Sequence, residues 1–276
     1  MMSQRGVGMQ RKLVWALSPL LWLAGSGVAR ADDEPIVEKL EHGEVNWSKK
    51  TIIATGSGAP ALKNADNVAQ VRLAAERAAK IDAFRNVVEA LKGIRINGLD
   101  TAAAPLNDAQ IRTQVQGIVQ GCKTVDTRYY SDGGVDVVVK CPLDGGLATV
   151  LSPTKDRKTL NTTGEAKYTG LIIDAVGLKA QPALAPKVSE GTTELYAPEM
   201  VIPSFLRQHG AAGYARSVDL AKQDARVGKN PLVLKASGTG GSPSDLTISA
   251  EEAAKLKDQN LTFLAEARVV IATDGP

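Results

Sequence analysis

The stretch ADNVAQVRLAAERAAKIDAFRNVVEALKGIRI, residues 65–96, decides how the first half of the chain folds. Its apolar residues recur every three or four positions, as on one face of a helix; they are Val71, Ala74, Ala78, Ile81, Phe84, Val88 and Leu91. Gly93 follows where a helix C-cap belongs. The pattern predicts one long helix from about residue 65 to residue 92. The alanines from Ala74 to Ala83 favour close packing on the domain's own sheet, the alternative being a partner helix.

The segments around this helix predict a small α+β domain over residues 50–151. Its further elements are predicted as a strand at 51–55, a turn at Gly56-Ser57-Gly58, a strand at Ile94-Arg95-Ile96, a helix capped by Asn107-Asp108 and ended by Gly121, and strands at 123–130 and 135–140 joined by Ser131-Asp132-Gly133-Gly134. Together they make a β-α-β-α-β-β unit with one long Ala-rich helix on a sheet.

Two cysteines, Cys122 and Cys141, lie almost symmetrically about the predicted hairpin turn. An odd register puts them on the same face of the hairpin, so a cross-strand disulfide is the first interpretation. The alternative is a pair of buried free thiols. A metal or catalytic role would need His or Cys neighbours that the sequence does not supply.

The N-terminal residues have the pattern of an export signal. Arg11 and Lys12 precede an apolar run from Leu13 to Ala24, and Ala29-Arg30-Ala31 matches a small-x-small cleavage site. The run is too short for a membrane span, which makes a retained anchor the weaker alternative. Residues 1–31 are therefore predicted to be a signal peptide, and the mature chain is predicted to act outside the cytoplasm, in the periplasm or at the cell surface.

Removing this segment changes the charge. The whole chain carries a net charge of +3, but residues 1–31 hold four bases and no acid, which leaves 29 bases against 30 acids. No Lys/Arg-rich patch remains, and Trp47 is the only tryptophan after Ala31. The sequence therefore shows neither the basic residues that follow a phosphate backbone nor the aromatic residues that stack on bases, and we do not expect nucleic acid as a partner.

The rest of the chain is predicted to form a polar lead-in at 32–49, a linker at 152–167 and a second α+β domain at 168–276. The linker prediction rests on a polar segment without apolar periodicity. In the second domain the predicted elements are a strand at 168–176, a turn-rich crossing at 182–186, a hairpin at 187–196, a helix at 217–225, a strand at 232–236, a flexible loop at 237–242, a capping box at Ser249-Ala250-Glu251-Glu252 and a strand at 263–272.

The passage AAKIDAFRNVVEALKGIRI, residues 78–96, and the Asp132-Gly133 hairpin that leads into Val135-Asp136-Val137 resemble the lipoprotein-twenty family of bacterial envelope proteins. That family is similar to the N-terminal domain of flagellar assembly protein T. The resemblance covers roughly residues 50–143 and implies a small α+β module of the bacterial envelope, without a known catalytic centre and associated with outer-membrane or flagellar assemblies. Many relatives carry a lipid-anchoring cysteine that this chain lacks near Ala31. The second half resembles C-terminal extensions of such proteins and implies no function.

Glycine-rich segments and histidines supply the candidates for chemistry. Residues 56–61 satisfy G-x-G-x-x-A, but the helix begins too late to aim its N-terminus at a pyrophosphate, so we interpret them as a turn. The loop at 238–242 lacks the Gly-Lys-Ser/Thr of a phosphate loop. His42 and His209 belong to no zinc-binding pattern and are expected to be solvated.

Two weaker constellations stay open. A non-sequential triad could join His209 to Asp174. Asp174, together with Glu266 near Arg268, could also belong to a buried charged cluster rather than to a solvated sheet face. The sequence thus predicts no catalytic, cofactor-binding or metal residues. The first hypothesis is an exported, non-catalytic envelope protein that binds other envelope proteins, accessory to a surface or flagellar assembly. The alternative is a periplasmic hydrolase or small-ligand-binding protein that uses an interdomain cleft.

Overall fold

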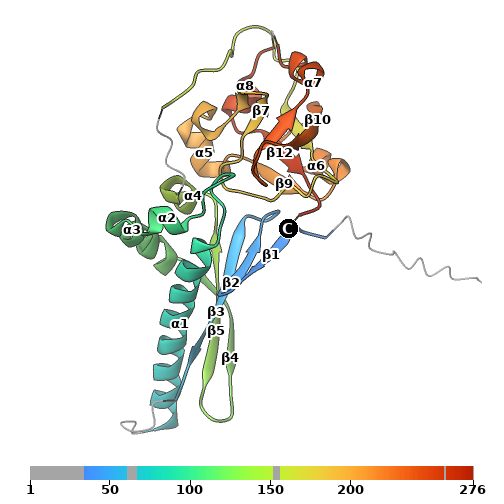
Figure 1. Ribbon diagram of the computed structural model, residues 1–276. Coiled ribbons are helices and arrows are strands. Elements are labelled where there is room, and N and C mark those ends of the chain that lie inside the picture. The colour runs from blue at the N-terminus through green and yellow to red at the C-terminus, as the bar shows by residue number, and fades with distance from the viewer. Residues whose placement is uncertain (1–33, 61–66, 152–155, 258, 276) are drawn as a thin grey trace, which may run out of the picture. The chain divides into compact units, whose positions relative to one another are not determined.

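The computed structural model describes residues 34–60, 67–151, 156–257 and 259–275. The predicted signal peptide, residues 1–31, lies outside this range, as does the start of the predicted linker at 152–155. The described residues belong to one compact unit with two β-sheets, and they have the α+β architecture predicted from the sequence (Figure 1). In the part of the chain that is described, no helix combines the length and apolar character needed to cross a bilayer.

The first sheet is antiparallel, with the strand order β1-β2-β3-β5-β4. Its strands are β1 (Val37–Leu40), β2 (Gly43–Asn46), β3 (Thr51–Gly58), β4 (Lys123–Tyr129) and β5 (Val135–Pro142). The first two strands correct the sequence analysis, which expected only a polar lead-in over residues 32–49. These strands form because their segment buries Ile36, Val45 and Trp47. The polar residues between these three side chains made the apolar pattern hard to recognise in the sequence.

Helix α1 (Val68–Lys92) begins at the N-cap Asn67, whose side chain accepts from the Gln70 backbone N–H, and ends at Gly93. The sequence analysis chose the wrong face of this helix as the buried one. The face that is buried follows the predicted one by about one residue and repeats mostly every four positions. It consists of Val71, Ala75, Ala79, Ala83, Val87, Ala90 and Leu91. Ala74 and Ala78 are exposed, and Ile81 is 65% exposed.

The reason for this phase is a close approach between the backbones of α1 and β3. A Cβ atom at Gly56 would lie 2.0 Å from the Ala83 nitrogen, and one at Gly58 would lie 1.9 Å from the Ala75 oxygen. Only glycine on the strand, facing alanine on the helix, permits this packing. Gly56-Ser57-Gly58 is therefore the end of β3 and not the expected turn, and residue 61 of the dinucleotide-like pattern lies outside the described residues.

The hairpin of β4 and β5 has the predicted antiparallel pairing, with Lys123 opposite Lys140. This register brings Cys122 beside Cys141, and their sulfur atoms are 2.00 Å apart, the distance of a disulfide. Cys141 is fully buried on the side of the sheet that carries α1.

Three shorter helices complete this domain: α2 (Ala103–Leu106), α3 (Ala109–Gln120) and α4 (Gly146–Leu151). Helix α3 has the predicted cap, because the Asp108 side chain accepts from the backbone N–H groups of Gln110 and Ile111. The strand expected at Ile94-Arg95-Ile96 does not form. The carbonyls of Arg95 and Ile96 instead accept from the N–H groups of Leu184 and Ala185 in the second half of the chain.

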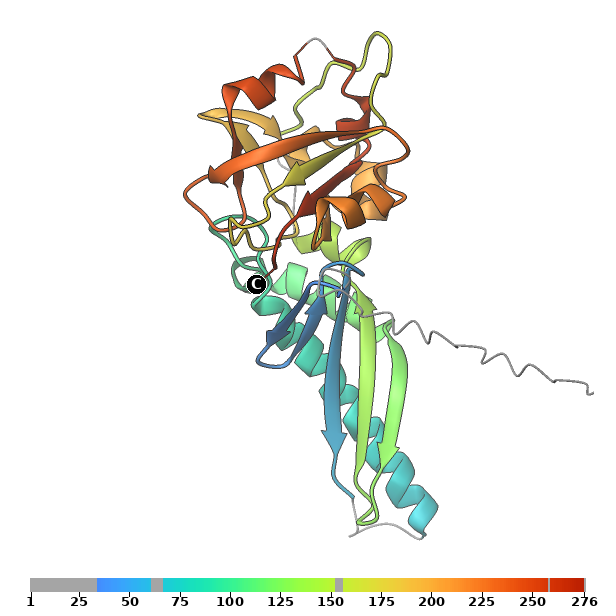
Figure 2. The ribbon, with the colours of Figure 1, turned by 90° about the vertical axis from the view of Figure 1, so that its right-hand side faces the viewer.

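The second sheet has the order β8-β7-β11-β10-β6-β12-β9, and its core strands β10, β6, β12 and β9 are parallel (Figure 2). Its elements are β6 (Gly170–Asp174), β7 (Val188–Glu190), β8 (Thr193–Tyr196), η3 (Pro198–Met200), α5 (Pro203–His209), β9 (Gly213–Ala215), α6 (Val218–Gln223), β10 (Pro231–Thr239), β11 (Leu246–Ile248), α7 (Ala250–Ala254), α8 (Thr262–Ala265) and β12 (Val269–Ala272).

The predicted 187–196 hairpin and the Ser217-capped helix are present. Two boundaries differ. Strand β10 continues through residues 237–239 of the expected flexible loop because it pairs there with β11, and residues 263–265 are helical rather than part of the last strand. Residues 156–167 form no helix or strand, but the Lys158 N–H donates to the Glu199 carbonyl and the Asn161 carbonyl accepts from Leu261.

Candidate functional site

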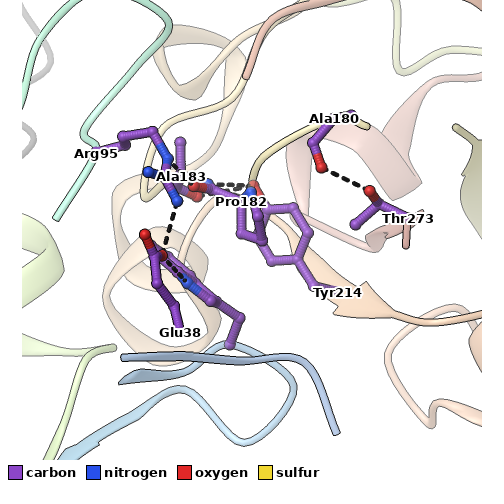
Figure 3. A network of polar contacts seen from close by, with 8 residues as sticks. Glu38, Arg95, Ala180, Pro182, Ala183, Tyr214 and Thr273 are labelled. Atoms are coloured by element: carbon purple, nitrogen blue, oxygen red, sulfur yellow. Dashed lines mark hydrogen bonds and ion pairs between the residues drawn. The ribbon is translucent and has the colours of Figure 1, made fainter. Parts of the chain in front are cut away.

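A buried polar network crosses the seam between the two sheets (Figure 3). Arg95, from the first domain, donates from Nε to the Pro182 carbonyl at 3.0 Å and from Nη2 to Glu38 Oε2 at 2.7 Å. The same carboxylate oxygen accepts from Trp47 Nε1 at 2.8 Å. The side chains of Arg95 and Glu38 are only 17% and 13% exposed, so this ion pair is largely removed from solvent.

Aromatic rings extend the same seam. The Trp47 ring meets the Tyr214 ring edge to face, with centroids 5.8 Å apart. The Tyr214 hydroxyl donates to the Ala183 carbonyl and accepts from its N–H (Figure 3). Burial raises the pKa of Tyr214, which keeps the phenol protonated. Because each of these polar groups has a partner within the protein, we interpret the network as a structural connection rather than a reactive centre.

A second feature of the seam is an open polar pocket of about 450 Å³. It is lined by Lys50, Asp144, Phe205, His209, Asp224, Ala225, Arg226, Glu266 and Arg268. The pocket therefore brings together two of the residues considered in the sequence analysis, His209 and Glu266. Asp174 does not line it; its side chain lies at the end of β6, where it accepts from the Val176 N–H.

Two cations converge in this pocket on one backbone oxygen. Lys50 Nζ and the Arg226 guanidinium both donate to the carbonyl of His209, at the C-terminal end of α5, where the helix dipole is negative. Among the described residues, neither cation has a carboxylate oxygen within 4.0 Å. Burial and the charge of Arg226 hold the pKa of Lys50 well below its usual value.

The lining of the pocket carries three carboxylates, those of Asp144, Asp224 and Glu266, beside its cations. No Ser, Thr or Cys is among its lining residues, and Glu266 is held by Arg268 Nε at 2.7 Å. The His209 ring stacks on Phe205, and burial, Arg226 and Lys50 lower its pKa. The described residues contain no cluster of three or more His, Cys, Asp or Glu side chains that could hold a metal ion. The arrangement is suited to contact with an anion, through Lys50 and Arg226.

The other histidine does not line this pocket and lies in the β1–β2 turn. His42 is exposed, and its Nε2 is 3.9 Å from Glu41 Oε1. This agrees with the expectation that His42 is a solvated residue.

The first sheet offers a different kind of site. Helix α1 covers one of its faces, and no helix of the described ranges lies on the opposite face (Figure 2). We call this second surface the open face; on β3 and β5 it consists of Ile53, Thr55, Ser57, Asp136, Val138 and Lys140. Ser57 Oγ and the Tyr130 hydroxyl both donate to the Asp136 carboxylate, at 2.6 Å each, and these two bonds lower the pKa of Asp136.

Strand β4, at the edge of this sheet, is the most exposed strand of the domain. All its side chains except Thr127 are exposed. Val125 is 52% exposed and Tyr129 is 53% exposed, and Tyr130, directly after the strand, is 46% exposed. Tyrosine and aliphatic side chains that remain in solvent on an edge strand are typical of protein-binding surfaces.

The same domain has a groove with mixed polar and apolar walls on its helical side. It has a volume of about 580 Å³ and lies between α1 and the α2–α3 segment, with Ile81, Phe84, Val88, Leu106 and Val119 in its walls. Ile81, Phe84 and Val88 belong to the stripe that the sequence analysis expected to face the sheet. Their spacing in the sequence indicated an apolar helix face, and the structure shows that this face lines a groove instead.

The important residues of the seam were missed in the sequence analysis. Arg95 was taken as part of a strand, Lys50 as the start of the domain, and Trp47 as a residue of the lead-in. The only sequence signal was a lone tryptophan at the end of the alternating segment Gly43–Trp47. The partners Pro182 and Tyr214 are more than a hundred residues away from it in sequence, so no local pattern connects them.

Comparison with known families gives one match. Residues 170–275 match the family model described as the second domain of Treponema pallidum Tp0624. This range begins at the first residue of β6 and includes all of the second sheet. The comparison with curated proteins finds no match. Residues 170–275 are thus similar to this Treponema domain.

Proposed function

We propose that this protein is exported and works in the cell envelope by binding other proteins, through the open face and the strand β4 of its first domain. The observation that carries the proposal is the exposure of Val125, Tyr129 and Tyr130 along an edge strand whose outer side has no strand beside it among the described residues. The fold itself does not need these side chains in solvent, because the core of the domain is complete between the sheet and α1.

Three further points support a contact function. The N-terminal residues have the pattern of a secretion signal, and the cysteine pair lies at disulfide distance, which suits an oxidising compartment. The resemblance of residues 50–143 to the lipoprotein-twenty family implies an envelope module without a catalytic centre. The seam pocket has no Ser, Thr or Cys in its lining, and the described residues hold no cluster of three or more His, Cys, Asp or Glu side chains that could bind a metal ion. An accessory role in a surface or flagellar assembly is the form of this function that the resemblance favours.

The test is capture from envelope fractions by the immobilised protein, compared with two variants that each place a charge on an exposed valine. Val125→Glu changes β4, and Val176→Glu changes a site of similar exposure, 46%, in the second domain. We expect proteins captured by the unmodified chain to be lost with Val125→Glu and retained with Val176→Glu, while both variants keep the native circular dichroism spectrum. Equal capture by both variants would refute the proposed surface.

A second candidate function, binding of a small anion, is favoured by one specific observation: Lys50 and Arg226 lie together in the seam pocket without a carboxylate partner. The probe is inorganic phosphate, measured by calorimetry against the unmodified chain and Arg226→Met. Saturable binding that Arg226→Met abolishes would support this function.

For the hydrolase alternative, the double change His42→Ala and His209→Ala is decisive, because loss of the cellular phenotype in a folded variant would contradict a contact function.

A further inference from the structure

Strand β4 ends the first sheet, and its outer edge has no strand beside it among the described residues (Figure 2). The direction of its backbone groups follows from the hairpin. The Tyr130 N–H donates to the Gly134 carbonyl, and the Tyr130 carbonyl accepts from Gly133, so both groups of Tyr130 point toward β5. In an antiparallel ladder these directions alternate, which turns the N–H and C=O groups of Thr127 and Tyr129 toward the free edge.

A free edge can be paired by a second copy of the same strand. Antiparallel pairing that continues the sheet requires a twofold axis perpendicular to it, and this axis keeps each side chain on its own face. Since neighbouring residues point to opposite faces, a residue at the axis must lie opposite itself. In the exposed middle of β4 the axis can therefore pass at Asp126, Thr127 or Arg128.

The charges of the opposed side chains distinguish these three registers. An axis at Asp126 opposes two carboxylates, and an axis at Arg128 opposes two guanidinium groups. An axis at Thr127 instead places Asp126 of each copy opposite Arg128 of the other, and Val125 opposite Tyr129. Opposite charges and aromatic–β-branched pairs are the favourable cross-strand combinations. The sequence of β4 is thus self-complementary in one register only.

The geometry of β4 suits this register. Asp126 and Arg128 already share a face, with Arg128 Nε 2.9 Å from Asp126 Oδ2, so two copies would bring four alternating charges together on the open face. Thr127 presents its backbone groups outward, as a hydrogen-bonded pair at the axis requires. The β-bulge between Thr124 and Asp126 lies at Val125, so the regular ladder between two copies is confined to residues 126–128 and the Val125–Tyr129 pairs lie at its two ends.

We infer that the protein forms a twofold dimer in which the β4 strands of two copies pair antiparallel about Thr127 and join the two first sheets into one. The inference rests on the proposed contact function and names one partner for that surface, a second copy of this chain. The short ladder implies a weak dimer whose population depends on protein concentration.

Single cysteines test the register in the full chain, which keeps its own cysteine pair. Under mild oxidation we expect Thr127→Cys to give a covalent dimer in high yield, because the two copies of residue 127 face each other at the axis. Asp126→Cys and Arg128→Cys, which report the other two registers, should give little. Covalent dimer from either of these, with none from Thr127→Cys, would overturn the inference.

Charge reversal tests the interface without a cross-link, by sedimentation across a concentration series. Asp126→Arg alone places like charges opposite each other twice in the dimer, so we expect the dimer dissociation constant to rise about tenfold or more. The double change Asp126→Arg with Arg128→Asp restores both pairs and should restore dimerisation. A chain that is monomeric throughout, or that dimerises regardless of these changes, refutes the inference. If it is monomeric yet still captures other envelope proteins through β4, the proposed function stands; if it does neither, both fall.

Discussion

The two faces of the first sheet are built from alternate residues of the same strands, but they are constrained very differently. On the covered face of β3, Ile52, Ala54, Gly56 and Gly58 are buried against α1, and the glycines leave no room even for a Cβ atom. On the open face, Ile53 is half-buried and Thr55 and Ser57 are exposed. Packing fixes the first set of residues. It leaves the second set free, so the side chains exposed on the open face and along β4 carry the information about function.

The seam between the sheets extends the same contrast. Its buried charges and aromatic rings are satisfied by each other, whereas the exposed tyrosines of the hairpin contact mainly solvent and surface carboxylates. A satisfied network stabilises a fold, while an unpaired strand edge is available to a partner. Substitutions at buried, satisfied positions should therefore lower the stability of the protein much more than matched substitutions at exposed positions, and the largest differences are expected on the covered face.

The largest effect is expected on the covered face, from neighbouring alanines of α1. Ala79 is fully buried against the sheet, and Ala79→Glu would bury an unpaired carboxylate where the backbone cannot move apart. We expect a loss of about 5 kcal/mol or more in the free energy of unfolding. Ala78→Glu, one residue earlier and exposed, is the matched control and should change it by less than about 0.5 kcal/mol. Equal sensitivity at the two positions would mean that the helix phase is wrong.

The seam should respond next. Arg95→Met removes the partner of a carboxylate that is 13% exposed and leaves the Pro182 carbonyl without its donor. Loss of one member of a buried pair costs about 3 to 4 kcal/mol, measurable by urea denaturation. Arg268→Met is the control, because its pair with Glu266 is more exposed, at 43% and 23%, and is worth at most about 1 kcal/mol. If the two variants are equally stable, the seam does not hold the domains together.

The cysteine pair joins β5 to the residue before β4, at the end of the hairpin that is away from its turn. Closing a loop of 19 residues should stabilise the protein by about 3 kcal/mol in the chain-entropy model. We therefore expect a reductant to lower the free energy of unfolding of the unmodified chain, and to have no effect on the double variant Cys122→Ala with Cys141→Ala. Thiol counting under denaturing conditions gives the independent check, since two free thiols in protein from an oxidising compartment would contradict the bond.

Local signals explain which parts of the fold could be predicted from the sequence. The long helix, the Asp108 cap, the Asp132-Gly133 hairpin and the place of the cysteines all depend on residues close together in the chain, and these predictions were correct. The phase of α1 was not, because alanines lie on several of its faces and only the glycines of β3 select one. The seam depends on contacts such as Arg95 with Pro182, 87 residues apart, which periodicity does not encode.

The smallest effect concerns the segment that joins the two halves. Glu194, on β8, accepts from Lys158 Nζ and, at 2.9 Å, from Lys187 Nζ, and these bonds lower its pKa. A carboxylate with a lowered pKa stabilises the fold at pH values above its unfolded pKa, and this contribution is lost as the pH falls through the folded pKa. We therefore expect Glu194→Gln to lower the free energy of unfolding by about 1 kcal/mol or less at pH 7. The difference from the unmodified chain should begin to shrink as the pH falls below about 4, the ordinary pKa of a glutamate, and should vanish only below the lowered pKa of the folded state.

The same substitution should release Lys158 locally and so accelerate trypsin cleavage after Arg157 and Lys158, which are exposed. Exposed segments without helix or strand are where proteases cut first, and the Glu194 contact is one of the few that hold this segment. Lys222→Gln, which removes a surface lysine from α6, is the control and should leave the cleavage rate unchanged. A cleavage rate that Glu194→Gln does not change would show that the joining segment is held by its backbone contacts with Glu199 and Leu261 and not by this ion pair. Early cleavage within α1 would instead contradict the joining segment as the first site of cleavage.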